Sequence, residues 1–407
     1  MKISFIGAGK LGLPLASILA KNNKILLIDK NKNLISALTE KKYHFNEKDL
    51  NQLLNNNYSN FIDFTSSYEL IFSKTTHTII LVNTQLGSDG YSDELVLDVI
   101  NELCTFYKED IKKRHHFILS STVLPGTINK LINVIEESTG KKYIEDFDFS
   151  YVPDFVKLGS VINDFKNPEF FLIGTKTNNA FEEVLQIWEN VHENNTPIKK
   201  LSLEETEIAK VSLNAYIVNK ISFANFLQLI CDNLDIDAKN ITDVIGLDSR
   251  IGNKFFSPGA PYGGTCFPRD ALAFEKFAND HNYNALNMEF SKSVNLSVLE
   301  NLYKQLEKFN KVSIFGVSFK QDTDVLVGSP SIDLIRLLIK NNKKVGYFDY
   351  IVKDLGVEGL DSVLSHHDPQ IIIDKSEAIV LMHNDKRFQN LNFNDVKVFD
   401  PWRVLSP

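Results

Sequence analysis

Short apolar runs alternate with longer stretches of mixed polar and apolar residues through about the first 175 positions. Strands separated by helix-length segments predict βαβ units and a mostly parallel sheet. Ligands bind such sheets at the carboxyl ends of the strands, and those ends here are rich in Asn, Ser, Thr and Asp. The strand-like runs are KISFIGAG (2–9), NKILLID (23–29), HTIILVNT (77–84), HHFILSST (115–122), DFSYVPD (148–154) and EFFLIG (169–174).

The pattern changes at residues 203–234, which contain no Gly or Pro and keep apolar residues at helical spacing. A helix of about 30 residues is about 45 Å long, too long to lie on one small domain. We therefore expect it to connect two domains and to offer a dimer contact. A second alternating region begins near Lys311 with KVSIFGVSF, KKVGYFDY, EAIVLMHND and VKVFDPW. The chain is thus expected to hold two α/β domains joined by a long helical middle.

Composition narrows the class of protein. Hydrophobic residues make up 43% and charged residues 24%, as in a soluble globular protein. Lys and Arg number 44 against 52 acidic residues, and a net charge of −8 argues against a nucleic-acid surface. No apolar stretch reaches about 18 residues, so no membrane span is expected. The first strand begins at the N-terminus, so no signal peptide is expected either.

The three cysteines, Cys104, Cys231 and Cys266, form no CxxC pair, and their number is odd. A disulfide scaffold or a structural zinc site is therefore not expected, and a cytoplasmic location is. The sequence predicts no metal site.

The motif GAGKLG at 7–12 closes the first strand and opens a helix. Its glycines allow a tight turn and the close approach of a pyrophosphate to the helix N-terminus. The second strand ends at Asp29, where a carboxylate can accept from a ribose 2′-hydroxyl and would repel a 2′-phosphate. These features predict a dinucleotide site for NAD. The strand ends VNTQ (82–85) and SSTV (120–123) would line the same crevice, or they cap the helices that follow.

Cys266 stands in GAPYGGTCFPRD (259–270), where Pro261, Gly263, Gly264 and Pro268 enforce a loop. A cysteine just before a helix start has its thiolate favoured by the helix dipole and by the nearby Arg269. We therefore expect Cys266 to be a nucleophile, with Asp270 suited to steering a water molecule. The alternative is a buried packing cysteine, which is the interpretation given to Cys104 and Cys231.

Several stretches, in order, carry a family resemblance: GAGKLG, STV, EIAKVSLNAY, KISF, DSRIGNKF, YGGTCFPRD, FK before DTD, SP and DPWRVL. Together they resemble the UDP-glucose/GDP-mannose dehydrogenase family of nucleotide-sugar 6-dehydrogenases. The resemblance implies an α/β protein with two Rossmann-like parallel-sheet domains, joined by a long central helix and a helical dimerisation region. The implied division is an NAD-binding domain at 1–199, a dimerisation and catalytic region at 200–300, and a nucleotide-sugar-binding domain at 301–407.

The resemblance also implies oxidation of a sugar C6 alcohol to a carboxylate, with two NAD⁺ reduced per product. Cys266 would add to the intermediate aldehyde, and the thioester formed by the second oxidation would be hydrolysed by water. Lys210 and Asn214 would stabilise the oxyanion at C6 from one face of a helix. Asp270 would activate or orient the water, and Thr122 would hold substrate or water. Lys210 could instead be a solvated helix position.

The cofactor and substrate contacts follow from the same resemblance. Expected cofactor contacts are Gly7, Gly9, Lys10, Leu11, Gly12, Asp29, Val82, Asn83, Thr84, Ser121 and Thr122. Expected substrate contacts are Phe155, Lys157, Lys210, Asn214, Lys220, Asn225, Arg250, Phe255, Tyr262, Gly263, Lys320 and Arg403. Among these, Phe255, Tyr262 and Gly263 would meet the sugar and uridine, Lys320 the nucleotide or its phosphates, and Arg250 a sugar group across the dimer.

Two stretches depart from the family pattern. In PDFVKL, Asp154 stands where the family usually has Glu, and Leu158 replaces a second acid. Asp154 would still assist as a base through an extra water. The family's arginine before Ser-Pro is absent, because Val327 and Gly328 stand there.

UDP-glucose is the favoured substrate, because the PxFxxxGSxIxDFxxP pattern at 153–168 is similar to that of the UDP-glucose type. Another UDP-hexose, UDP-N-acetylmannosamine and GDP-mannose stay open. So does a non-catalytic nucleotide-sugar-binding homologue. The expected protein is a homodimer that binds neither nucleic acid nor membrane.

Overall fold

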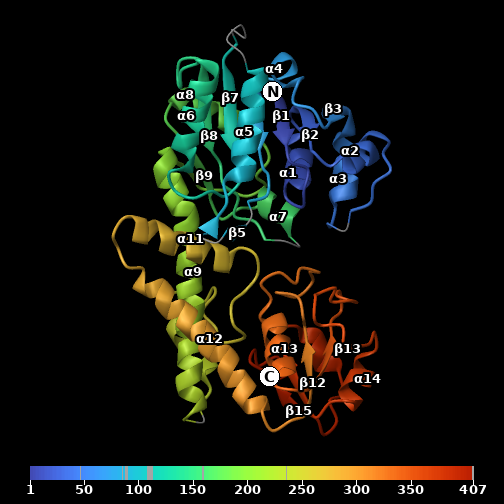
Figure 1. Ribbon diagram of the computed structural model, residues 1–407. Helices are drawn as coiled ribbons and strands as arrows, with labels where there is room; N and C mark the ends of the chain where they lie inside the picture. The colour runs from blue at the N-terminus through green and yellow to red at the C-terminus, as the bar shows by residue number, and fades with distance from the viewer. Residues whose placement is uncertain are drawn as a thin grey trace. The chain divides into compact units, whose positions relative to one another are not determined.

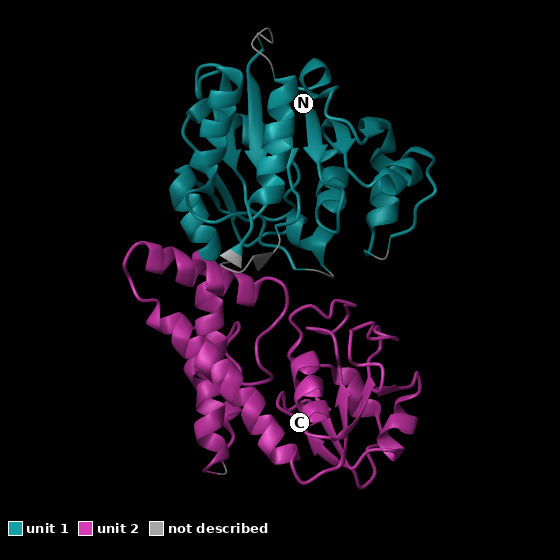
Figure 2. Ribbon diagram, viewed as in Figure 1, with its two compact units in different colours: residues 1–211 teal, residues 212–407 magenta. Residues whose placement is uncertain are grey.

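The computed structural model describes residues 1–45, 47–84, 86–87, 90–107, 113–157, 160–234 and 236–405 (Figure 1). The chain divides into two compact units, residues 1–211 and 212–407 (Figure 2).

Unit 1 is built on an eight-stranded sheet in the order β10-β9-β8-β7-β4-β1-β2-β3. Among the strands that the structure describes in this sheet, neighbours pair in parallel except β8 and β9, which are antiparallel. The order reverses between β1 and β4, as in a Rossmann fold. The strands are β1 (Lys2–Ile6), β2 (Lys24–Ile28), β3 (Phe61–Thr65), β4 (His77–Ile80), β7 (His115–Leu119), β8 (Phe147–Tyr151), β9 (Phe171–Thr175) and β10 (Ile198–Leu201). A small hairpin joins β5 (Leu86–Gly87) and β6 (Gly90–Tyr91).

Helices cover both faces of this sheet, because its strands are apolar on both sides. One face packs on α1 (Gly12–Leu19), α2 (Lys32–Thr39), α3 (Leu50–Asn57), α7 (Val161–Lys166) and α8 (Asn178–Ile187). The other packs on α4 (Ile71–Lys74), α5 (Glu94–Phe106) and α6 (Thr127–Thr139). A 3₁₀ turn, η1 (Tyr58–Asn60), precedes β3. Unit 1 therefore has three layers, with the carboxyl ends of the strands left for a ligand.

The predicted long helix is present as α9 (Leu203–Asp232), a helix of 30 residues. It belongs to both units, since the boundary between them falls at residues 211 and 212. Its lack of Gly and Pro explains its length, because nothing in it interrupts the backbone hydrogen bonds.

Unit 2 continues with α10 (Ala238–Gly246), α11 (Phe267–Asp280) and α12 (Leu286–Leu306), followed by a five-stranded parallel sheet in the order β13-β12-β11-β14-β15. Apolar clusters on both faces of this sheet again give three layers. The elements are β11 (Lys311–Phe315), α13 (Pro330–Lys340), β12 (Lys344–Phe348), β13 (Leu364–Ser365), α14 (Pro369–Asp374), β14 (Ala378–Leu381), η2 (Lys386–Asn390) and β15 (Lys397–Phe399).

The predicted fold class, two parallel α/β sheets joined through a long helix, is confirmed. Among the described residues, no helix is both long and apolar enough to span a bilayer.

Candidate active site

The GAGKLG turn is shaped by close backbone packing. Gly7 has φ 101°, and a Cβ there would lie 2.1 Å from the carbonyl oxygen of Leu81. At Gly12, the first residue of α1, a Cβ would lie 2.0 Å from the carbonyl oxygen of Gly7. Among the described residues, by contrast, no atom lies within 4 Å of a Cβ built at Gly9. Gly7 and Gly12 are thus required by the fold, whereas Gly9 leaves the surface open beside the helix start.

Asp29 links the end of β2 to this glycine turn. Its Oδ2 accepts a hydrogen bond from the Ala8 N–H at 2.6 Å, and its Oδ1 accepts from the Asn31 N–H at 2.8 Å. The second bond is the strand-end turn that a short acid commonly makes. The first places the carboxylate at the glycine turn, where a ribose hydroxyl is predicted to bind.

Ser121 joins the ends of β4 and β7. The Val82 N–H donates to Ser121 Oγ at 2.9 Å, and the Ser121 hydroxyl donates to the Val82 carbonyl at 2.8 Å. This pairing brings Asn83, Thr84 and Thr122 to the same sheet edge as the glycine turn. Gln85, part of the same prediction, lies outside the described residues.

Glu207 on α9 was not among the predicted site residues. Its side chain is fully buried, and its carboxylate accepts from the Gly126 N–H at 2.9 Å and the Ile128 N–H at 2.8 Å. These are free N–H groups at the start of α6. Burial raises the pKa of Glu207 to about 7. Glu207 therefore ties α9 to the loop that follows Thr122. The signal that could have found it is an acid at the head of the largely apolar stretch EIAKVSLNAY.

Lys210 lies one turn further along α9 and is only 6% exposed. Its ammonium donates to the backbone carbonyl of Asp154 and stands 4.5 Å from the centroid of the Phe155 ring. The interpretation of Lys210 as a solvated helix position is therefore wrong. The structure brings Lys210, Asp154 and Phe155 together, while Lys157 is exposed. Leu158 lies outside the described residues.

Cys266 is an exposed free thiol at the start of α11. Its carbonyl accepts the helical hydrogen bond of the Asp270 N–H at 2.8 Å, and Arg269 Nη2 lies 4.0 Å from its Sγ. The helix start and the guanidinium both carry positive charge and lie close to the sulfur. The alternative of a buried packing role is wrong for Cys266, but Cys104 and Cys231 are buried as expected.

Asp270 lies one helical turn after the cysteine and is 1% exposed. Asn214 Nδ2 donates to its Oδ2 at 2.5 Å, and Arg269 Nε lies 3.4 Å from its Oδ1. Burial holds the pKa of Asp270 well above its usual range. Unit 2 therefore groups Cys266, Asp270 and Asn214, with an acid whose neutral form is favoured by burial.

The glycines of the cysteine loop pack against a second loop of unit 2. Gly264 has φ 86°, its N–H donates to the carbonyl of Gly328 at 2.8 Å, and a Cβ there would lie 2.5 Å from the Phe319 ring. A Cβ at Gly263 would lie 2.3 Å from the Gly328 oxygen. The space beside both residues is thus filled by protein, and the loop is held by backbone packing. The departure from the family pattern at Val327, which is 69% exposed, falls in this second loop.

Two predicted substrate residues hold loop backbone in the structure. Asn225 is buried, accepts from the Gly259 N–H at 2.9 Å and donates to the Ala260 carbonyl at 3.3 Å. Lys220 Nζ donates to the Ile251 carbonyl at 3.0 Å and the Gly252 carbonyl at 3.2 Å. Asn225 in particular fixes the loop that leads to Cys266.

The aromatic residues predicted to meet the sugar lie close to this loop. Phe255 has φ 58°, and its ring meets that of Phe267 edge to face at 6.0 Å. The Tyr262 backbone is held by both side-chain atoms of Asn295, at 2.8 and 3.0 Å.

The three remaining predicted cations lie apart in unit 2. Arg250 is paired with Asp248 at 2.6 Å and is exposed. Arg403 donates to Gln228 at 3.3 Å, and Lys320 Nζ stands 5.8 Å from the Phe319 ring centroid.

Comparison with known proteins identifies the family to which this chain belongs. Three models of the UDP-glucose/GDP-mannose dehydrogenase family match the chain in order: the NAD binding domain at residues 1–192, the central domain at 204–297 and the UDP binding domain at 313–407. The chain belongs to this family.

Relatives that are named for different substrates have nearly the same sequence identity to this chain. The UDP-glucose 6-dehydrogenase AglM of Haloferax volcanii is 29% identical over 366 residues, covering 87% of this chain and 84% of that protein. The GDP-mannose 6-dehydrogenase of Pseudomonas putida is 28% identical over 413 residues, covering 96% and 93%. The solved UDP-glucose dehydrogenase of Pyrobaculum islandicum superposes with a TM-score of 0.90 at 26% identity, covering 98% of this chain and 94% of that one.

The predicted family, enzyme class and cofactor are therefore confirmed. This chain is an NAD-dependent nucleotide-sugar 6-dehydrogenase.

Proposed function

We propose that this dehydrogenase oxidises the C6 hydroxyl of UDP-glucose to a carboxylate through a thioester on Cys266. The observation that carries the proposal is an exposed thiol at a helix start, one helical turn before the buried Asp270, whose carboxylate is held by Asn214. A cysteine that only packs in a core is buried among apolar residues, whereas a nucleophilic cysteine must be accessible and lie near polar groups.

The proposed reaction consists of two oxidations at C6 followed by hydrolysis of a thioester, and different residues act in each step. NAD⁺, when bound, accepts the hydride removed from C6 in each of the two oxidations. Between them, the Cys266 thiolate adds to the C6 aldehyde and forms the thiohemiacetal. Its oxidation leaves a thioester, which water attacks, releasing the carboxylate and returning the thiol. Asp270 takes a proton from the attacking water, which its raised pKa suits.

Lys210 and Asn214 are proposed to stabilise the negative oxygen at C6. They lie four residues apart on α9, so the helix presents them on one side. The buried ammonium of Lys210 already binds a carbonyl oxygen, that of Asp154, which is the kind of partner that an oxyanion would replace. The glycine turn and Asp29 are proposed to hold the NAD pyrophosphate and ribose.

UDP-glucose is preferred over the other sugars for two reasons. The family model for a UDP binding domain matches residues 313–407, and the pattern at 153–168 is similar to the UDP-glucose type. GDP-mannose is the second candidate, because a GDP-mannose 6-dehydrogenase is almost as similar to this chain. We also propose a cytoplasmic homodimer with the three-part division given by the sequence.

NADH absorbance with a panel of nucleotide sugars tests the substrate and the nucleophile together. Wild type is expected to release two NADH per UDP-glucose, faster than with UDP-galactose, UDP-N-acetylmannosamine or GDP-mannose. Cys266→Ser should lower acid formation by at least about 100-fold while NAD binding is kept. The matched control is Cys231→Ala, which removes a buried thiol and should keep turnover.

Two results would contradict parts of this proposal separately. Full turnover in Cys266→Ser overturns the thioester. No NADH from any sugar, with NAD and nucleotide-sugar binding intact by calorimetry, favours a binding homologue.

A further inference from the structure

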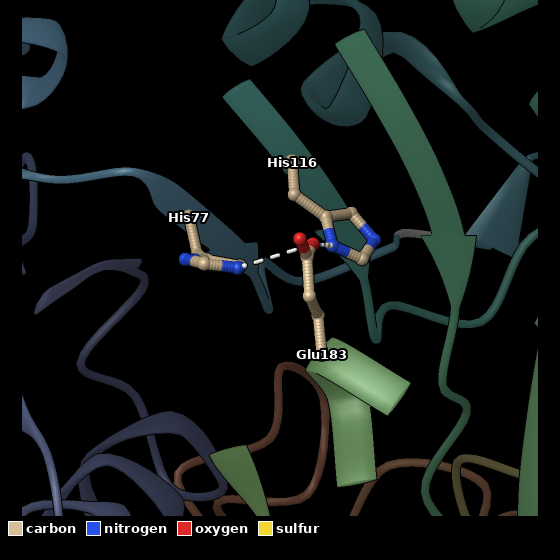
Figure 3. Close-up of side chains that lie close together, drawn as sticks. All are labelled: His77, His116 and Glu183. Carbon is tan, nitrogen blue, oxygen red and sulfur yellow. Dashed lines mark hydrogen bonds and ion pairs between the residues drawn. The ribbon is translucent and has the colours of Figure 1, made fainter. Parts of the chain in front are cut away.

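A cluster of two histidines and a glutamate lies at the amino edge of the unit 1 sheet (Figure 3). His77 is the first residue of β4 and His116 the second of β7, and the two are paired in register. Paired residues of parallel strands project to the same face, so both rings lie side by side, with centroids 5.5 Å apart. Both side chains are buried, at 5% and 2% exposure.

Glu183 reaches both rings from α8. Its Oε2 lies 2.8 Å from His116 Nδ1 and 3.4 Å from His77 Nε2, and the donor atoms of all three residues lie within 4.8 Å of one another. Figure 3 shows the carboxylate lying between the two imidazoles. Among the described residues, His77 Nε2 finds no partner with hydrogen-bond geometry, although it is buried. A buried ring nitrogen in that state is unfavourable unless something else occupies the site.

The outer nitrogens of both rings are held by hydroxyls. Thr76 Oγ1 lies 2.8 Å from His77 Nδ1, and Ser150 Oγ lies 2.8 Å from His116 Nε2. Histidines that bind metals almost always have the remaining ring nitrogen hydrogen-bonded to an oxygen, which fixes the tautomer and the ring orientation. In the metal-bound form each hydroxyl would accept from that outer nitrogen, which would leave the nitrogen facing Glu183 with its lone pair for the ion.

We propose that His77 Nε2, His116 Nδ1 and Glu183 Oε2 bind one Zn²⁺ ion. Zinc bonds of about 2.0–2.2 Å in a tetrahedral site place neighbouring donor atoms about 3.3 Å apart. Glu183 Oε2 lies 2.8 and 3.4 Å from the two ring nitrogens, so small side-chain shifts would bring the three donors to that spacing. Two imidazoles with one carboxylate favour zinc and exclude Mg²⁺ and Ca²⁺, which prefer oxygen ligands. The Glu183 side chain is 27% exposed, so water can reach the fourth position.

This site is separate from the nucleotide-sugar chemistry. The five residue steps from His77 to Val82, at the cofactor edge, span about 17 Å of extended chain. The ion would instead join α8 to β4 and β7, and its effect is expected on the stability of unit 1. The sequence predicted no metal site, because the ligands lie on three elements far apart in the chain and share no motif spacing.

Metal binding to the full-length chain tests the proposal. After treatment with a chelator, wild type is expected to bind one Zn²⁺ per chain by calorimetry, and its unfolding midpoint should rise by several degrees. Co²⁺ should bind in its place and give the intense visible absorption of a four-coordinate site, while Mg²⁺ and Ca²⁺ should give no effect. Glu183→Gln and His116→Gln should each weaken Zn²⁺ binding by at least about tenfold.

Two control variants keep the outcome decisive. Glu182→Gln makes the same charge change at the neighbouring, exposed position of α8 and should bind Zn²⁺ as wild type does. The double variant of the stacked pair His366 and His367, both changed to Gln, removes two adjacent histidines elsewhere in the chain and should also bind normally.

The proposal is overturned if wild type takes up no stoichiometric Zn²⁺. It is equally overturned if Glu183→Gln, folded by circular dichroism, binds the ion as tightly as wild type. If only the His366 and His367 variant loses Zn²⁺ binding, while Glu183→Gln and His116→Gln keep it, the ion belongs to the pair His366 and His367 and the proposal is overturned. Because Glu183 is partly exposed, its amide variant is expected to fold even if the buried histidine variant does not.

Discussion

At the scale of single residues, two glycines of the GAGKLG turn have different roles: Gly7 is needed for folding, and Gly9 is proposed to make room for the cofactor. Gly9→Ala adds a methyl group into open space, so stability should change by less than about 1 kcal/mol. That methyl group would lie where the NAD pyrophosphate is proposed to approach, so the KM for NAD should rise at least about tenfold with kcat less affected. Steady-state kinetics and thermal unfolding measure the two effects.

Gly7→Ala is the matched comparison, because φ 101° and the nearby Leu81 oxygen make any side chain there unfavourable. It should lower the unfolding midpoint as well as activity. A Gly9→Ala enzyme with an unchanged KM for NAD would contradict the proposed cofactor position.

Some individual residues could be singled out from the sequence. Cys266 and Asp270 stand out because a thiol and an acid follow a glycine-proline loop, and Lys210 is given by the family resemblance; their catalytic roles stay predictions. The partners of these groups were not predictable. Asn225 holding the loop at Gly259, and Gly264 packed against Gly328, depend on contacts between segments far apart in the chain.

At the scale of elements, the tie between α9 and the start of α6 predicts a pH dependence. The pKa of Glu207 is raised to about 7 in the folded chain, against 4.5 for a solvated glutamate. Between those values the folded state holds more protons than the unfolded state, so this group's contribution to stability falls as pH rises. The loss is about 3 kcal/mol by pH 8.

Glu207→Gln removes that titration, so the variant should gain stability relative to wild type as pH rises from 5 to 8. Denaturant unfolding at several pH values measures the difference, and Glu205→Gln, at an exposed position of the same helix, serves as control. A difference between Glu207→Gln and wild type that stays constant with pH would contradict the raised pKa.

The elements themselves were predictable where their apolar pattern was strong. All six strand-like runs of the first 175 residues form strands, and α9 begins at the predicted residue. β3 and β10 were missed, because FIDFT mixes an acid into its apolar residues and IKKL is mostly exposed. The antiparallel pairing of β8 and β9 was also beyond prediction, since a strand's direction depends on how the chain crosses the sheet.

At the scale of the whole molecule, the helical part of unit 2 exposes several large apolar side chains. They include Tyr216, Leu234, Val244, Leu247, Tyr283, Leu286 and Leu296, each more than half exposed. We propose that an interface covers apolar side chains of this group. The proposed occupant is a second copy of the chain, as the family resemblance implies.

Val244 and Leu247 lie three residues apart at the end of α10 and are 69% and 84% exposed. Changing both to Glu places four charges across a two-fold interface, where burying them without partners is unfavourable. The variant's dimer dissociation constant should therefore rise at least about 100-fold. Light scattering coupled to gel filtration should show a dimer for wild type and a monomer for the variant.

The control variant is Ile351→Glu, which changes an apolar residue of 45% exposure outside the helical part and should stay dimeric. A wild type that elutes as a monomer at micromolar concentration would leave the exposed apolar residues without the proposed partner and would contradict the homodimer.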